Sequence, residues 1–292
     1  MGISFKGVSH KYRGMRRKDI TVALDNINLN INDKDEFIFV IGRTGSGKST
    51  LISHMNGLLL PTEGEVDICG YHLTRKVRKN PKLKPVRKKI GFVFQFPEYQ
   101  LFEENVYKDI IFAPTNFGFK AEEIDESLNE VCKLLNINEA LLKKSPFNLS
   151  GGQMRKVAIA GVLAYRPDIL ILDEPTRGLD PQTAEEIMEI FYKIHKELHK
   201  TIIAISHDMD LVYKYATRCV VMKDAKVCFD GSCEELFSTE AYKDYHLRKP
   251  EILSVIDGIN EKMGIKLPYD IHTSDELILK LKEAISWWII LQ

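Results

Sequence analysis

The sequence has no excess of charge of either sign and no apolar run long enough to span a membrane. Its 292 residues carry 41 basic and 41 acidic side chains, so no global field favours nucleic acid or an anionic membrane surface as a partner. The longest apolar stretches, 157–164 and 285–291, fall well short of the ~18 residues that a span needs, and no signal peptide opens the chain. We therefore expect any work at a membrane to be done from its surface.

Cysteine is scarce and irregularly spaced. The chain has five cysteines, an odd number, and no pair has the C-x-x-C spacing of zinc or redox sites. They are Cys69, Cys132, Cys219, Cys228 and Cys233. This pattern favours reduced thiols in a cytosolic protein over disulfides or a structural metal. Apolar residues make up 44% of the chain, which is ample for a core in one large domain or one domain with an appendage.

A glycine-rich stretch at residues 42–50 carries the strongest functional signal. Its sequence, GRTGSGKST, matches the phosphate-loop pattern G-x-x-x-x-G-K-[ST], with an apolar run of strand length before it and a helical pattern after it that ends at Gly57. In such a loop, backbone N–H groups and a helix N-terminus face the phosphates, and the lysine adds positive charge. The residues expected to bind a nucleoside triphosphate are Gly42, Arg43, Thr44, Gly45, Ser46, Gly47, Lys48, Ser49 and Thr50. The Ser49 hydroxyl is also a predicted Mg²⁺ ligand.

Two acidic residues follow a second buried strand. The stretch 168–175, DILILDEP, has four consecutive apolar residues followed by Asp173 and Glu174. Ligands of open α/β sheets bind at the carboxyl ends of strands, so we predict that Asp173 holds Mg²⁺, directly or through water. Glu174 is predicted to polarise the water that attacks the γ-phosphate. The alternative, two acids that merely begin a helix, is disfavoured by the phosphate loop in the same chain.

Three further side chains end strand-like runs where a nucleotide would lie. Gln95 can contact Mg²⁺ or the attacking water, although an ordinary polar strand cap also fits this stretch. His207 stands at the predicted position of a γ-phosphate contact, although a lone histidine is usually structural. Tyr12 ends an alternating stretch, 3–12, that predicts an edge strand, and its ring could stack on a purine base. Strand tyrosines usually only pack, which is the alternative for Tyr12.

A second glycine-containing helix start follows a helical insert. Residues 103–148 show helical patterns without a strand signal, and the sequence LSGGQ at 149–153 then precedes a strongly periodic helix. One phosphate tail has no use for a phosphate loop and a further anion-binding helix end from the same chain. We therefore expect this end to serve a nucleotide held by another subunit. The residues concerned are Ser150, Gly151, Gly152 and Gln153.

A basic stretch at 75–89 has nine basic residues and no acid. A patch for a phosphate backbone would look similar, but no aromatic residue is interleaved. We expect a solvated loop broken by Pro81 and Pro85, and no nucleic-acid partner.

In chain order, these motifs resemble the nucleotide-binding subunit of an ATP-binding cassette (ABC) transporter, from residue 1 to about 240. The motifs are GRTGSGKS, Gln95, LSGGQ, ILILDEP, the loop 178–180 and His207. FVFQFPEYQLF and LSGGQMRKVAIAGVLA are similar to ATPase subunits of energy-coupling factor (ECF) transporters, more to the A-prime type (CbiO-like) than to its paralogue. The resemblance implies an α/β fold: a P-loop NTPase (RecA-like) core, an antiparallel β-subdomain and an inserted α-helical signature subdomain at about 100–160. It also implies an ATPase domain at 1–244 and a small helical C-terminal extension at 245–292.

The resemblance also implies roles for individual residues. Glu174 corresponds to the catalytic base, His207 to the switch histidine, and Gln95 to the Q-loop residue that also ligates the metal. Tyr12 corresponds to the aromatic that stacks on adenine. Ser150 and Gly152 correspond to contacts with the phosphates of a nucleotide in the partner subunit, and Gly151, Gln153 and Asp180 are also expected to bind nucleotide. One position departs from the family, because Arg177 stands where a small residue is common.

The tail contains two predicted helices. Pro250 begins a short one that ends near Gly264, and Thr273 with Glu276 forms a capping box for the second. One face of the second helix is apolar: Leu277, Ile278, Leu281, Ala284, Ile285 and Trp288. The resemblance implies an extension that helps to join two subunits, and a hairpin that covers its own core remains an equal alternative.

The function predicted from these observations is ATP binding and hydrolysis, with Mg²⁺, in an ECF-type importer of a vitamin or metal ion. The chain is expected on the cytoplasmic side of the cell membrane, as a peripheral subunit. The predicted partners are a paralogous ECF ATPase, an integral membrane T component and a substrate-binding membrane S component. A heterodimer is favoured because two Arg177 side chains would face each other across a homodimer axis. The alternatives are the ATPase of a conventional ABC importer and a soluble ABC ATPase of DNA repair or translation, which usually has a coiled coil or a second cassette.

Overall fold

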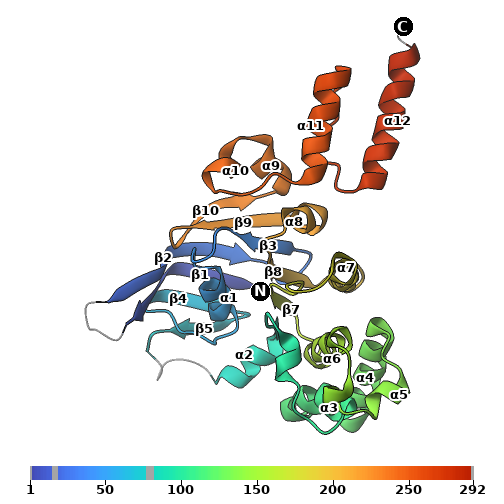
Figure 1. Cartoon of the computed structure of the whole chain (residues 1–292). Coiled ribbons are helices and arrows are strands. Elements are labelled where there is room, and N and C mark those ends of the chain that lie inside the picture. Colours follow the sequence, from blue (N-terminus) through green and yellow to red (C-terminus); the bar gives the residue numbers. More distant parts are fainter. Residues whose placement is uncertain (1, 15–18, 77–81, 291–292) are drawn as a thin grey trace.

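A mostly parallel sheet of six strands lies at the centre of the described chain (Figure 1). The structure, a computed structural model, describes residues 2–14, 19–76 and 82–290, with side chains up to residue 285 in the last helix. The strand order is β10-β9-β3-β8-β7-β6, and only β10 is antiparallel to its neighbour. The strands are β3 (Phe37–Ile41), β6 (Ile90–Val93), β7 (Ile169–Asp173), β8 (Thr201–Ile205), β9 (Arg218–Lys223) and β10 (Lys226–Gly231). All residues of β3 and β8 are buried, as expected for parallel strands covered on both faces.

A second, antiparallel sheet has the order β2-β1-β4-β5. Its strands are β1 (Ile3–Arg13), β2 (Ile20–Ile31), β4 (Glu63–Ile68) and β5 (Tyr71–Thr74). The prediction of an edge strand at 3–12 is wrong, because β1 pairs with β2 on one side and with β4 on the other. An alternating pattern indicates that one face is buried, but it does not indicate which strands lie beside it.

The two faces of the central sheet are covered by different parts of the chain. On one face, Ile38 and Val40 belong to an apolar cluster with the antiparallel sheet and with α1 (Lys48–Met55). On the other face, Phe37 and Phe39 belong to a cluster with helices. These helices include α6 (Gly151–Leu163), α7 (Pro181–Leu198), α8 (Met209–Tyr215) and α9 (Cys233–Ser238). The loops at the carboxyl ends of the parallel strands stay free to form a site.

The predicted helical insert is present between β6 and β7, at the lower right of Figure 1. It contains α3 (Val106–Phe117), α4 (Ala121–Leu135), α5 (Glu139–Leu142) and α6, with the short 3-10 turns η2 (Pro97–Gln100) and η3 (Pro146–Asn148). Local signals set its boundaries. The Asn105 side chain accepts the Lys108 N–H at 3.0 Å to begin α3, and Gly118, with a φ of 81°, ends that helix.

Part of the basic stretch is helical, which corrects the prediction of a loop over 75–89. Helix α2 covers Leu83–Lys89 and contains Pro85 in its first turn, where a missing N–H breaks no helical hydrogen bond. Val86 of this helix is buried. Residues 77–81 of the stretch, with Pro81, lie outside the described residues.

The C-terminal helices begin and end as expected. After α10 (Ala241–Asp244), Pro250 precedes α11 (Glu251–Met263), which Gly264 ends with a φ of 66°. Thr273 and Glu276 form the capping box of α12 (Ser274–Ile290), because each backbone N–H donates to the other side chain at 3.2 Å. Residues of both helices pack on the chain's own core, although Ile278 is exposed. The side chain of Trp288 lies outside the described residues.

Two cysteines meet across the fold. Cys219 of β9 and Cys233 of α9 lie side by side, with a Cα–Cα distance of 5.9 Å that a disulfide allows, and the expectation of reduced thiols stays a prediction for this pair. Cys69, Cys132 and Cys228 are free. Among the described helices, none has both the length and the apolarity to cross a membrane.

Candidate functional site

The phosphate loop connects β3 to α1 and has a conformation that two of its glycines make possible. Gly42 has a φ of 136° and Gly47 a φ of 104°, values that side chains rarely tolerate. A Cβ atom on Gly42 would lie 2.1 Å from the carbonyl oxygen of Met222, and one on Gly47 would lie 2.2 Å from that of Ala23. Neighbouring backbone therefore fills the space behind the loop, and the open side of the loop is left for a ligand.

Lys48 lies inside the loop that it would serve. Its Nζ donates to the carbonyl oxygens of Gly42 at 2.7 Å and Arg43 at 2.9 Å. Burial lowers the pKa of Lys48, although the charges of Glu174 and Asp173 oppose the shift. Ser49 at the next position is exposed. The Ser46 hydroxyl is buried without a hydrogen-bond partner among the described residues. The loop thus holds a positive charge and polar groups for an anion.

The Glu174 carboxylate, at the carboxyl end of β7, has three side-chain partners. Its Oε2 accepts hydrogen bonds from Gln95 Nε2 at 3.0 Å and from Arg177 Nη1 at 2.8 Å, and its Oε1 lies 3.0 Å from His207 Nε2. Gln95 follows β6 and His207 follows β8, the two strands beside β7. Glu174 has a φ of 48°, an uncommon backbone conformation that turns the chain at this point. The structure therefore brings the three residues predicted as catalytic together.

The two acids of this site have pKa values shifted in opposite directions. Burial would raise the pKa of Glu174, but the hydrogen bond from Arg177, the charge of His207 and the hydrogen bond from Gln95 outweigh it and lower the pKa. Burial, and then the charge of Glu174, raises the pKa of Asp173. Glu174 is thus kept ionised at neutral pH, as a group that accepts a proton must be.

Glu174 and the phosphate loop line the same cavity. A space of about 420 Å³ is bordered by Thr44 of the loop, by Glu174 and Arg177, and by His207. An adjoining space of about 380 Å³ lies between the loop and the segment 246–248. This segment, which leads into the C-terminal helices, carries His246 and was not predicted as part of the site.

Tyr12 lies near α1, as its predicted role requires. It is 43% exposed, and its hydroxyl is 3.2 Å from Thr50 Oγ1 in the first turn of that helix. The ring of His10 packs against it edge-on, with 4.6 Å between centroids. The exposed ring is therefore held beside the phosphate loop, and its contact with a base stays a prediction.

The signature residues lie on the helical insert. Ser150 is the N-cap of α6 and forms a capping box with Gln153, whose backbone N–H donates to Ser150 Oγ at 3.3 Å. Gly151 and Gly152 have open space where a Cβ would stand. Asp180 caps α7 by accepting the Thr183 N–H at 3.0 Å. These contacts explain local helix starts, and the predicted contacts with a partner's nucleotide stay predictions.

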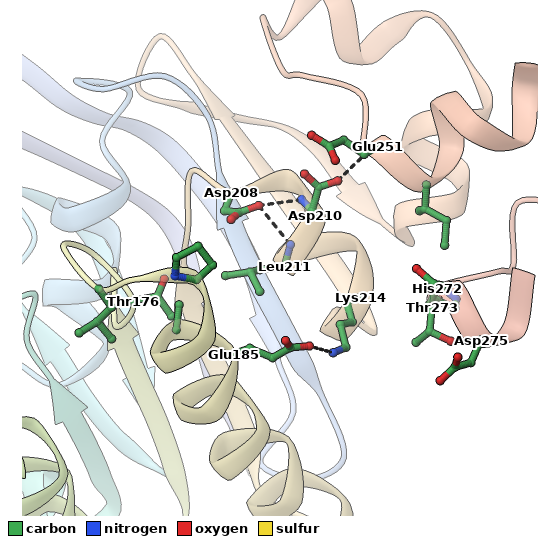
Figure 2. Close-up of a pocket in the computed structure, with 15 residues that line it drawn as sticks. Thr176, Glu185, Asp208, Asp210, Leu211, Lys214, Glu251, His272, Thr273 and Asp275 are labelled. Atoms are coloured by element: carbon green, nitrogen blue, oxygen red, sulfur yellow. Dashed lines mark hydrogen bonds and ion pairs between the residues drawn. The ribbon is translucent and has the colours of Figure 1, made fainter. Parts of the chain in front are cut away.

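A separate cavity of about 710 Å³ lies between α7, α8 and the C-terminal helices (Figure 2). The side chain of Asp208 accepts the N–H groups of Asp210 and Leu211, and Asp210 accepts the Glu251 N–H at 2.6 Å (Figure 2). The acidic residues that line it are Glu185, Asp208, Asp210, Glu251 and Asp275. This acidic lining disfavours a triphosphate in this cavity. Asp210 of α8, the helix that follows His207, is thus hydrogen-bonded to the first residue of α11.

Sequence reasoning missed Arg155, and it identified Arg177 as unusual without its contact with Glu174. The contact of Arg177 with Glu174 follows from a turn in which the Arg177 N–H also donates to the Glu174 carbonyl at 3.1 Å. Pro175 between them is a signal for such a turn. Arg155 of α6 contacts Glu98 and the carbonyl groups of Pro175 and Arg177. No local pattern indicates Arg155, because its partners are far away in the sequence.

Comparison with known proteins agrees with this geometry. A family model described as ABC transporter matches residues 24–177. The energy-coupling factor transporter ATP-binding protein EcfA2 of Bacillus cereus is 48% identical over 269 residues, which cover 92% of this chain and 91% of that protein. The chain belongs to the ABC transporter ATPases of the energy-coupling factor type. This ECF ATPase is also 46% identical to EcfA2 of Ligilactobacillus salivarius, over 89% of the chain and 91% of the relative.

Solved structures show the same fold. cbiO1 from Clostridium perfringens, described as part of the ABC transporter complex cbiONQ, has a TM-score of 0.71 and 36% identity, over 87% of this ECF ATPase and 98% of that chain. The ATP-binding cassette MJ0796, described as a dimer in a post-hydrolysis state bound to ADP and Pi, has a TM-score of 0.68 and 32% identity, over 79% and 98%. The predicted family, fold class and ATPase activity are therefore confirmed.

Proposed function

We propose that this ECF ATPase hydrolyses ATP with Glu174 as general base and that hydrolysis drives import of a vitamin or a metal ion. The observation that carries the catalytic assignment is the meeting of Gln95, Arg177 and His207 at the Glu174 carboxylate, beside the phosphate loop. An ionised carboxylate at this place can orient a water and take its proton as the water attacks the γ-phosphate. The import function is supported by the descriptions of the EcfA2 relatives and of the cbiONQ complex.

The nucleotide would be held from several sides. The backbone of residues 42–47 and the Lys48 ammonium group bind the phosphates, and the exposed Tyr12 ring stacks on the base. His207 contacts the γ-phosphate when it leaves Glu174. Helix α6 of a second subunit would close the site with the residues that follow its N-cap, Ser150. Asp180 is the N-cap of α7 and so holds the loop that leads into that helix.

Mg²⁺ fits the polar groups of this site. The Ser49 hydroxyl is exposed, and Asp173 lies at the end of β7 next to Glu174. Gln95 donates its amide nitrogen to Glu174, which leaves its carbonyl oxygen for a metal. Hydroxyl, carboxylate and carbonyl oxygens are the donors that Mg²⁺ prefers. The ion would neutralise charge on the phosphates, while the residues named here hold it in place.

A groove beside the Q-loop supplies a surface for the membrane component. A space of about 450 Å³ lies between the end of β6, α3 and α6. Its aromatic lining residues are Phe92, Phe94, Phe102, Phe112, Phe117 and Tyr165. Phe102 is 58% exposed and packs edge-on against Phe112, with 4.9 Å between ring centroids. An amphipathic helix of the integral membrane T component would cover the rings among them that are exposed, Phe94, Phe102 and Phe112.

The second ATPase subunit is proposed to be a paralogue. The dimeric MJ0796 structures support a two-subunit arrangement. The sequence suggested that two Arg177 side chains would repel each other across a homodimer axis. The structure weakens this argument, because the Arg177 guanidinium is paired with Glu174 of its own chain. The proposal of a heterodimer therefore depends on the EcfA2 resemblance.

We further propose that residues 1–244 form the ATPase domain and 245–292 a helical extension. The chain would lie on the cytoplasmic side of the cell membrane, bound to the T component and, through it, to a substrate-binding S component. No nucleic-acid partner is proposed.

Purification of the tagged chain from its native membrane tests this assignment. We expect an ECF-type membrane subunit and one copy of a different ATPase in native mass spectra of the complex. Copurified membrane subunits of a conventional importer would contradict the ECF assignment, and a complex that contains two copies of this chain would contradict the heterodimer.

Phe147 supplies a matched control for substitutions of the groove residues, because it is 69% exposed but does not line the groove.

A further inference from the structure

Arg155 is a buried arginine whose guanidinium contacts two other segments of the chain. It lies on α6, three positions after the signature glycine Gly152, and is only 3% exposed. Its Nε and Nη2 donate to the two carboxylate oxygens of Glu98, both at 3.1 Å. Its Nη1 donates to the carbonyl oxygens of Pro175 at 3.4 Å and Arg177 at 3.2 Å. One side chain therefore joins α6, η2 and the turn that follows β7.

The segment on the Glu98 side leads to the groove. Glu98 belongs to η2, which begins two residues after Gln95 and ends two residues before Phe102. Tyr99, its neighbour, is 83% exposed, whereas the Glu98 side chain is only 16% exposed. Glu98 thus points inward, whereas Gln100 and Phe102 of the same segment line the groove.

The segment on the carbonyl side holds Glu174. Pro175 and Arg177 belong to the turn in which the Arg177 N–H donates to the Glu174 carbonyl at 3.1 Å. The Arg177 side chain then returns to Glu174 Oε2 at 2.8 Å. By binding both carbonyl groups, Arg155 sets the place of this turn, and the turn sets the direction of the carboxylate.

The chemistry of this contact requires arginine. A guanidinium has a planar fork that binds both oxygens of a carboxylate and still has an N–H group for the carbonyls, whereas an ammonium group offers a single point of charge. A buried ion pair adds little stability compared with apolar residues, and the removal of one partner leaves a costly unpaired charge. A plain apolar contact could join α6 to η2, so the ion pair is better explained by the need for a defined geometry.

We propose that Arg155 is a positioning residue for ATP hydrolysis, which fixes the turn that carries Glu174 relative to the segment 97–102 at the groove. Displacement of this segment by a docked membrane subunit reaches Glu174 through the Glu98 carboxylate, the Arg155 guanidinium and the two carbonyl groups. This inference rests on the proposed function, both for Glu174 and for the groove.

The test compares variants of the pair in the assembled, purified transporter. Glu98→Gln keeps the shape of the side chain and one acceptor oxygen, Arg155→Lys keeps the charge without the fork, and Arg155→Met keeps much of the length. The matched control is Glu186→Gln, which removes the ion pair that Lys156, the next residue of α6, makes at 3.5 Å with α7. Thermal unfolding of each preparation identifies the temperature at which all variants are folded.

We expect kcat to fall about ten- to a hundredfold in Glu98→Gln, Arg155→Lys and Arg155→Met, with KM for ATP within about twofold of the parent, because a small displacement of Glu174 affects the chemical step and not the phosphate loop. The double variant Glu98→Gln with Arg155→Met should be no slower than the slower single variant, because both changes break one connection. Glu186→Gln should retain parental kcat. Copurified membrane subunits should be unchanged in all of them.

Three results would overturn the inference. They are parental kcat in folded Glu98→Gln and Arg155→Met, effects of the two changes that multiply in the double variant, and rescue of kcat by Arg155→Lys. A Glu174→Gln preparation distinguishes a wrong role for Arg155 from a wrong assignment of Glu174 as the general base. Turnover by Glu174→Gln refutes the assignment of the base, whereas arrest of Glu174→Gln with parental kcat in the Arg155 variants refutes only the role of Arg155.

Discussion

A methyl group on Gly47 would occupy space that the backbone of β2 already fills. Gly47 caps α1 with a φ of 104° and a ψ of 3°, and its added Cβ would lie 2.2 Å from the Ala23 carbonyl oxygen. Gly45, in the same loop, has a φ of 83°, but a Cβ there would meet nothing within 4 Å. Gly151, at the start of α6, has open space and no positive φ. The three glycines therefore separate backbone strain from steric overlap.

The expected losses of stability follow from these two terms. Gly45→Ala should cost about 1–2 kcal/mol of the free energy of unfolding, because alanine must adopt a left-handed conformation. Gly47→Ala adds an overlap with main-chain atoms that cannot rotate away, which costs about 1–3 kcal/mol more. Gly151→Ala, with neither term, should stay within about 0.5 kcal/mol of the parent.

Urea unfolding of the three variants, followed by circular dichroism without nucleotide, measures these differences free of any contribution from binding. If Gly47→Ala were no less stable than Gly45→Ala, the close approach of the loop to β2 would be wrong. A destabilised Gly151→Ala would show that the open space at α6 is wrong.

Three other predictions address the stacking of Tyr12 on the adenine ring, the pH dependence of stability and the aromatic groove. Tyr12→Ala should weaken ATP binding by about 1–3 kcal/mol with little change in kcat, because stacking contributes equally to the ground and transition states; equal affinity by fluorescence titration would leave Tyr12 as a packing residue. Burial, opposed by the hydrogen bond to the Thr50 carbonyl, holds the pKa of His54 at about 4, below its usual 6.5, so the unfolded chain binds a proton that the folded chain does not. The free energy of unfolding should therefore fall as the pH is lowered from 6.5 towards 4. His54→Gln should reduce this pH dependence by up to about 1.4 kcal/mol per pH unit. An equal pH dependence in the parent and in His54→Gln would contradict a buried neutral histidine. Phe102→Asp should reduce both copurification of the membrane component and uptake while ATP binding persists, and Phe147→Asp should change neither; intact assembly and transport in Phe102→Asp would place the docking surface elsewhere.

Motifs that set local geometry could be recognised in the sequence. The phosphate loop requires glycine where the φ is positive, and it stands between β3 and α1 as predicted. The caps at Ser150 and Asp180 depend on side chains that bind backbone three residues away, so they too could be recognised. The positions of Asp173, Gln95 and His207 at the ends of neighbouring strands follow from the rule that parallel strands share one carboxyl edge.

Contacts between distant segments could not be predicted. The partners of Arg155 lie 57 residues before it and 20 or 22 residues after it, and Cys219 meets Cys233 only because α9 returns to β9. The place of β1 inside its sheet and the helical turn of 83–89 also depend on tertiary neighbours, such as the buried environment of Val86. Arg177 could be identified as unusual, but its contact with Glu174 required the shape of the turn.

The role of Glu174 is tested most directly by binding and hydrolysis of Mg²⁺-ATP in one preparation of the assembled transporter, with the parent, Glu174→Gln and Lys48→Ala. Glu174→Gln removes the base and leaves the phosphate loop intact, so we expect parental ATP affinity and hydrolysis slower by about 10²- to 10⁴-fold. Lys48→Ala should instead weaken binding, because a buried positive charge beside the phosphates is lost. Hydrolysis by Glu174→Gln at the parental rate would contradict the assignment of Glu174 as the base.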